Sequence, residues 1–120
     1  YAMLKNTNPS ESSATIRERV IKARATQQLR FAEYNLTAKS PIHCNAQMPP
    51  KLVRKYCILD AQSDKLLAYS MDKLGLSARA YDRILKVART IADLADVDNI
   101  GASHLMEAIS YRNLDRNNWI

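Results

Sequence analysis

The sequence predicts an all-α protein, a small helical bundle preceded by a basic helix and an extended connector. Ala, Leu, Lys, Arg and Ile dominate its 120 residues, a composition that favours helices. It contains only two glycines, whereas a fold of many strands needs glycine at its tight turns. Several stretches repeat apolar residues at spacings of three and four, the period of a helix with one buried face. We therefore expect helices from about residue 12 onward.

The first predicted helix covers residues 12–34 and follows a polar arm, residues 1–11, that we expect to be flexible. Ser12 and Ser13 can cap it, and Thr15 with Glu18 offers a competing capping box, which leaves the start open by a few residues. Its inner face is expected to hold Ile16, Val20, Ala23, Gln27, Phe31 and Tyr34. Its remaining surface is basic, with Arg17, Arg19, Lys22, Arg24 and Arg30. Such a surface is either a solvated cationic face or a contact with phosphate or an acidic partner.

Residues 35–48 show no helical period and are predicted to form an extended connector. Pro41, Pro49 and Pro50 punctuate this region, and the residue before each proline is restricted to extended geometry. Pro49 and Pro50 can open a short helix over residues 51–58, because proline is tolerated in a first turn. A connector of this length usually lies against another surface. Residues 49–120 are then expected to form the helical domain.

Two further helices are predicted to be joined by a very short turn. Asp60 caps a helix that ends at Leu74, Gly75 supplies its C-terminal cap, and Ser77 caps a long helix within residues 76–99. Helices joined by so short a turn must be neighbours. A last helix is expected to start near Gly101 or Ser103 and to end in a polar, frayed tail over residues 112–120.

The long helix has two contrasting faces. A buried stripe is predicted from Tyr81, Ile84, Leu85, Ala88, Ile91, Ala92 and Ala95. An outward polar face is predicted from Arg79, Asp82, Arg83, Lys86, Arg89, Thr90 and Asp93. Arg79 occupies the first turn, where a cation is disfavoured because the helix N-terminus is already the positive end of the dipole. An anion bound at this helix N-terminus would stabilise the arginine at that position. The alternative is an arginine that extends into solvent, at a cost of only ~0.3–1 kcal/mol.

Composition and motifs argue against catalysis by this chain itself. A net charge of +6 permits contact with nucleic acid, nucleotide phosphates or an acidic protein. No G-x-x-x-x-G-K-[ST], G-x-G-x-x-G or H-E-x-x-H motif is present. Cys44 and Cys57 have no metal-ligand spacing, so we expect free thiols in a reducing cytoplasm and no metal site. No signal peptide is visible and no apolar run reaches the ~18 residues that span a bilayer, so no membrane contact is expected.

Four stretches together resemble a known family. They are ESSATIRERVIKAR (residues 11–24), CNAQM (residues 44–48), LSARAYDRILKVARTIADLA (residues 76–95) and IGASHLMEAISYRNLDR (residues 100–116). They resemble the C-terminal domain of magnesium-chelatase-like AAA+ proteins, in the ComM and YifB subfamily. The resemblance implies an AAA+ lid that follows an α/β core, with the first helix as the end of that core. The chain would then be a fragment of a longer ATPase.

The resemblance also implies roles for individual residues. In AAA+ proteins the nucleotide lies between core and lid, and an arginine early in a lid helix, called sensor 2, approaches the γ-phosphate. Arg79 in L-S-A-R matches that position, and Arg83, one turn later, either assists or contacts the core. The Walker motifs and the magnesium site are absent from the sequence, so ATP and magnesium would be cofactors of the full-length protein only.

The partners implied by the resemblance are the protein's own AAA+ core, neighbouring subunits of a hexamer, and branched DNA processed by branch migration during natural transformation. Two alternatives remain open from the residues alone, a stand-alone helical nucleic-acid-binding module and a protein-interaction bundle. Arg17, Lys22, Arg24 and Lys86 are the candidate contacts to phosphate or to a partner.

Overall fold

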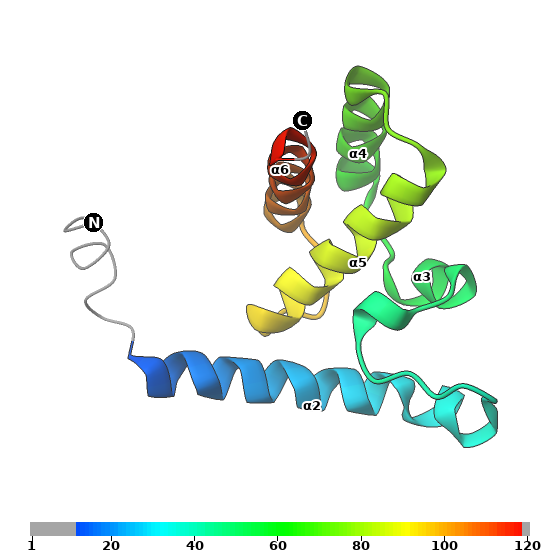
Figure 1. Ribbon diagram of the computed structural model, residues 1–120, viewed down its shortest axis with the longest axis vertical. Helices are drawn as coiled ribbons and strands as arrows, with labels where there is room; N and C mark the ends of the chain where they lie inside the picture. Colours follow the sequence, from blue (N-terminus) through cyan, green and yellow to red (C-terminus); the bar gives the residue numbers. More distant parts are fainter. Residues whose placement is uncertain (1–11, 119–120) are drawn as a thin grey trace.

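The fold is all-α, as predicted. The computed structural model describes residues 12–118, with the side chains of residues 12–111. No strand occurs within residues 12–118. The helices, with the labels of Figure 1, are α2 (Ser13–Thr37), the 3-10 helix η1 (Asn45–Gln47), α3 (Pro50–Tyr56), α4 (Ala61–Leu74), α5 (Ala78–Leu94) and α6 (Ala102–Asn118).

Helix α5 is the centre of the bundle. It contacts α2, η1, α3 and α6, while α4 lies against α6. Figure 1 shows α2 along one edge of the molecule, α4 and α6 beside each other away from it, and α5 running diagonally between them. The core joins all of these elements through the buried side chains of Phe31, Ile42, Met48, Leu52, Val53, Cys57, Leu67, Ile84, Leu85, Ala88, Ala92, Ile100, Leu105, Ala108 and Ile109.

The predicted caps are confirmed. The side chains of Ser12, Asp60 and Ser77 each accept a hydrogen bond from a backbone N–H three residues later, and so satisfy a first-turn donor that the helix leaves free. Gly75 ends α4 in the left-handed conformation, with φ +62°. Leu76 N–H then donates to the Met71 carbonyl, which completes the usual glycine-based end of a helix. The turn between α4 and α5 is therefore short and fixed by hydrogen bonds.

Several predicted boundaries were wrong. Helix α2 continues to Thr37 instead of Tyr34, and Ile16 on its expected inner face is exposed, because the N-terminal part of α2 extends past the bundle (Figure 1). Helix α5 stops at Leu94, so Ala95 becomes an exposed cap instead of part of the buried stripe. Asp96 follows with φ +60°, a left-handed conformation that ends the helix and that Asp tolerates better than most residues.

The connector lies against the bundle, as a long connector is expected to. Ile42, Asn45 and Met48 are buried in it. The predicted flexible arm, residues 1–11, and the end of the predicted frayed tail, residues 119–120, lie outside the described residues. Residues 112–118 continue the backbone of α6.

Candidate functional site

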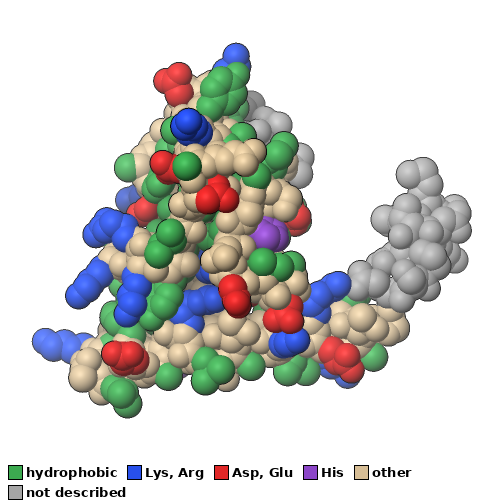
Figure 2. Space-filling view, turned by 180° about the vertical axis from the view of Figure 1, so that it is seen from behind, with side chains coloured by type: hydrophobic (Ala, Val, Ile, Leu, Met, Phe, Trp, Pro, Cys, Tyr) green, Lys and Arg blue, Asp and Glu red, His purple; other side chains and the backbone are tan. Residues whose placement is uncertain are grey.

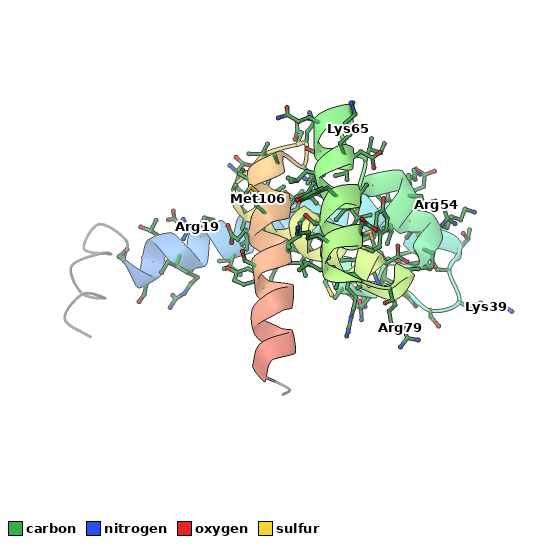
Figure 3. All side chains as sticks on the ribbon, turned by 90° about the horizontal axis from the view of Figure 1, so that it is seen from above. Arg19, Lys39, Arg54, Lys65, Arg79 and Met106 are labelled. Atoms are coloured by element: carbon green, nitrogen blue, oxygen red, sulfur yellow. The ribbon has the colours of Figure 1, made fainter. Side chains whose placement is uncertain are left out.

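The first turn of α5 presents a free cation. Ser77 Oγ accepts from the Ala80 N–H at 3.2 Å, and no acidic residue occupies this turn. Arg79 is exposed, and Figure 3 shows its side chain extending away from the bundle. None of the described carboxylates forms an ion pair with it. The guanidinium is therefore available to an anion approaching from outside, and it is not sealed inside the bundle.

Arg83 is the second exposed cation on this side of α5. It follows Arg79 by four residues, so the two side chains emerge one turn apart on nearly the same side of the helix. Arg54 of α3 and Lys39 of the connector extend from the same side of the molecule as Arg79 (Figure 3). The beginning of α5 thus belongs to a cationic surface to which two other elements contribute.

A groove with a volume of about 620 Å³ borders the start of α5. It is lined by Val53, Arg54 and Cys57 of α3, Met71 of α4, and Ala78, Tyr81, Asp82 and Leu85 of α5. Burial raises the pKa of the Cys57 thiol to about 11, so this thiol is protonated at neutral pH and is no nucleophile. The pKa of Tyr81 is also raised, mainly by burial and to a lesser extent by the negative charges of Asp64 and Asp82. The groove can therefore accommodate an apolar group beside a cation, but its thiol and phenol are not activated for catalysis.

A buried ionic cluster joins α2, η1 and α5, and the sequence did not reveal it. Nη1 and Nη2 of Arg30 donate to Oδ2 and Oδ1 of Asp93, both at 2.7 Å. Asn45 of η1 donates to Asp93 at 2.8 Å and accepts from Arg30 at 2.9 Å. Gln27 accepts from the Asn45 backbone N–H at 3.0 Å. Arg30 and Asn45 therefore reach Asp93 from elements that are distant in sequence.

Arg89 completes this ionic cluster and corrects the predicted polar face of α5. Its guanidinium lies 3.3 Å from Asp93 and donates to the carbonyls of Val97 and Asp98 at 2.9 and 2.8 Å. Arg89 and Asp93 were expected to face solvent, but both are buried, because α2 and η1 cover this side of the helix. Arg30, expected on the basic surface of α2, is likewise largely buried.

The ionisation of Asp93 follows from its partners. Burial alone would raise the pKa of this carboxyl. The hydrogen bonds from Arg30 and Asn45 and the positive charges of Arg30 and Arg89 outweigh burial, and the pKa lies below its ordinary value of 3.8. Asp93 is therefore a carboxylate that holds two cations together at the contact of α2 with α5.

The four candidate phosphate or partner contacts differ in their surroundings. Arg17 and Arg24 are exposed on α2. Lys22 Nζ is 2.7 Å from the Asp96 carboxylate, a solvent-exposed pair whose hydrogen bond and charge raise the pKa of the lysine. Lys86 Nζ donates to the Ala46 carbonyl at 3.3 Å. Two of the four candidates thus already have partners within the chain.

The remaining chemistry of the described residues is sparse. Cys44 is exposed and Cys57 is buried, and both are free thiols. Within residues 12–111, no group of three His, Cys, Asp or Glu side chains could hold a metal ion. None of the described helices combines the length and the apolar character needed to cross a bilayer.

Comparison with known proteins identifies relatives over nearly the whole chain. The family model described as magnesium chelatase, subunit ChlI C-terminal, matches residues 10–112. An uncharacterized protein named YifB from Escherichia coli is 43% identical over 108 residues, which cover 90% of this chain and 19% of that protein. YifB from Salmonella typhimurium is 42% identical over 106 residues, or 88% of this chain and 19% of the relative.

A third relative carries a more specific name. The competence protein ComM of Haemophilus influenzae is 40% identical over 114 residues, which cover 94% of this chain and 20% of that protein. The chain thus spans about a fifth of the length of the curated relatives it matches.

Proposed function

The chain belongs to the family of magnesium chelatase subunit ChlI C-terminal domains, and from that premise we propose that it is the helical lid of a longer AAA+ ATPase, with Arg79 as its sensor-2 arginine. The observation that carries this proposal is the exposed Arg79 in the first turn of α5, without a carboxylate partner among the described residues. A cation at this end of a helix is unfavourable by ~0.3–1 kcal/mol, and a bound phosphate offsets this cost because it attracts both the guanidinium and the positive end of the helix.

Arginine suits this role because its planar fork can donate to two phosphate oxygens at once and stays charged at any physiological pH. In ATP hydrolysis, negative charge shifts as the γ-phosphoryl group leaves, and a positioned guanidinium stabilises it. The 120-residue sequence has no Walker A pattern, so we propose that the α/β core of the same protein binds ATP and magnesium. In this proposal the chain alone does not hydrolyse ATP, and Arg83 assists Arg79 or contacts the core.

The buried ionic cluster suits a lid that moves as one body. Arg30 and Asp93 link α2, which we propose leads in from the core, to α5, which carries Arg79. A rigid link of this kind would transmit a displacement at the nucleotide to the entire bundle. We extend the proposal to the longer protein as a cytoplasmic hexamer that moves branched DNA, consistent with one relative being named a competence protein.

The test is ATP turnover of the longer protein with Arg79→Ala. We expect kcat to fall by at least ~100-fold, the usual effect of removing a group that stabilises transition-state charge. The control is Lys65→Ala, which removes an exposed cation of α4 that extends away from Arg79 (Figure 3) and should leave turnover unchanged. Unchanged turnover with Arg79→Ala, in a protein that retains its helical content, would remove Arg79 from the mechanism.

A second candidate function is nucleic-acid binding through α2, favoured by the exposed cations Arg17 and Arg24 on a helix that projects past the bundle (Figure 1). Gel-shift titration of the chain against duplex and branched DNA at several salt concentrations tests it. If these arginines contact phosphates, binding should weaken steeply as the salt concentration rises. The double variant Arg17→Gln/Arg24→Gln should also bind more weakly. Absence of a shift at low salt would exclude this function for the chain alone.

A further inference from the structure

Helix α2 has a second apolar face that the bundle does not use. Its inward face buries Ala23, Gln27 and Phe31. The outer stripe, which we define as Ile21, Ala25, Leu29, Ala32 and Leu36, follows spacings of four, four, three and four residues and therefore forms one line along the helix. At 100° per residue this line lies opposite the inward face.

Every member of the outer stripe is exposed to solvent. Leu29 is 79% exposed and Leu36 is 82% exposed. Figure 2 shows hydrophobic side chains along the edge of α2 that faces away from the bundle. Isolated exposed leucines are common on protein surfaces. A continuous apolar line over four helical turns, about 22 Å long, is instead typical of a surface that another element covers.

The borders of the stripe indicate the chemistry of that element. Arg17 and Arg24 lie along one border, exposed and without an ion pair among the described residues. Lys22 and Glu33 lie along the other border, and Lys22 is already paired with Asp96. The matching surface should therefore be apolar at its centre and carry carboxylates toward Arg17 and Arg24.

The size of the stripe decides between two sources of such a surface. It is about 22 Å long and about 10 Å wide, a footprint of roughly 220 Å². A stable complex between separate chains buries about 800 Å² per partner, so a second copy seated on this stripe alone falls far short. A partner in the same polypeptide is held at an effective concentration of about 1 mM, so a contact of small area is enough to keep the stripe covered. The curated relatives are about five times longer than this chain, so they contain ample sequence to supply it.

We propose that the outer stripe of α2 is the docking surface for the remainder of the longer protein, which covers it with an apolar patch bordered by carboxylates. This proposal rests on the proposed place of the chain within a longer protein, but it does not depend on the role of Arg79. It explains why α2 is apolar on two opposite sides, although the bundle itself needs only one of them.

Thiol labelling at Leu29 tests the proposal. Cys44→Ser first removes the exposed native thiol, while buried Cys57 stays. Leu29→Cys is then placed in this chain and in the longer protein, and the rate of N-ethylmaleimide modification at that position is measured by peptide mass spectrometry. With an effective concentration of ~1 mM and a Kd of ~0.1 mM, labelling should be about 10-fold slower in the longer protein. The matched control is Tyr69→Cys on α4, off the stripe and 64% exposed, which should react equally in both.

Two results would overturn the proposal. Equal labelling of Leu29→Cys in the chain and in the longer protein would show that nothing covers the stripe. Protection that disappears when the longer protein is diluted, or that arises in the chain alone at high concentration, would identify a second copy as the occupant. Leu36→Cys repeats the measurement at the far end of the stripe. Loss of turnover with Arg79→Ala has no bearing on any of these rates.

Discussion

Replacing Asp93 by Asn should destabilise the chain more than any other single charge removal at the contact of α2 with α5. Asp93 accepts two hydrogen bonds of 2.7 Å from Arg30 and one of 2.8 Å from Asn45, and its side chain is 1% exposed. The amide preserves the volume but leaves Arg30 and Arg89 as neighbouring cations without a counter-charge. Removing one partner of such a buried pair costs about 3–5 kcal/mol. At roughly 4 °C per kcal/mol, Tm should fall by about 12–20 °C.

The assay is urea and thermal unfolding of the 120-residue chain, followed by circular dichroism at 222 nm. Asp96→Asn is a closely matched control, because Asp96 also pairs with a cation of α2 at 2.7 Å, but in solvent. Asn tolerates the left-handed conformation of Asp96, so the backbone is not strained and little loss of stability is expected. Equal losses from Asp93→Asn and Asp96→Asn would refute the reasoning, since burial would then not matter.

Three further predictions concern the same bundle. Folding lowers the pKa of Asp93, so the stability that its carboxylate supplies is fully present above the ordinary pKa of 3.8 and is lost as the pH falls through the lowered pKa of the folded state. The stability of Asp93→Asn should therefore depend less steeply on pH during acid unfolding than that of the unsubstituted chain. Gly75→Ala should lower the free energy of unfolding by about 1–2 kcal/mol, measured by chemical denaturation. The new Cβ would meet no atom within 4 Å, so the cost comes from the φ of +62°, and a loss near zero would argue against that backbone conformation. At pH 8 a maleimide should modify the exposed Cys44 and spare Cys57, whose burial raises its pKa to about 11. If mass spectrometry detects rapid modification of both thiols, the packing of α3 over Cys57 is contradicted.

The elements whose ends depend on local chemistry were predictable from the sequence. Asp60 and Ser77 were predicted as caps and Ser12 as one of several candidates, because such side chains can accept from a backbone N–H three residues later, as all three do. Gly75 was identified because a left-handed residue ends a helix and glycine adopts it at no steric cost. Each of these signals lies within one turn of the residue that carries it.

Long-range ionic contacts were not predictable in this way. The spacing of Arg89 and Asp93 shows only that they lie on one side of α5, and it cannot show that α2 and η1 cover that side. Arg30 and Asp93 are 63 residues apart, and nothing near Arg30 distinguishes it from the exposed arginines of α2. The four-residue interval from Arg89 to Asp93 was the only local hint of an ion pair.

The availability of Arg79 was suggested by sequence, whereas its proposed ligand depends on family membership. A cation in a first turn is unusual but inexpensive, so the residue pattern alone favoured a side chain that extends into solvent. The structure places the guanidinium on the outside of the bundle without a partner among residues 12–111.

The most direct measurement is nucleotide affinity of the longer protein, by calorimetric titration with a non-hydrolysable ATP analogue and with ADP. If Arg79 contacts the γ-phosphate, Arg79→Ala should weaken binding of the analogue by about 10- to 100-fold, the equivalent of one or two hydrogen bonds to a charged group, and leave the Kd for ADP unchanged. Unaltered affinity for the analogue, or an equal loss for both nucleotides, would contradict that contact.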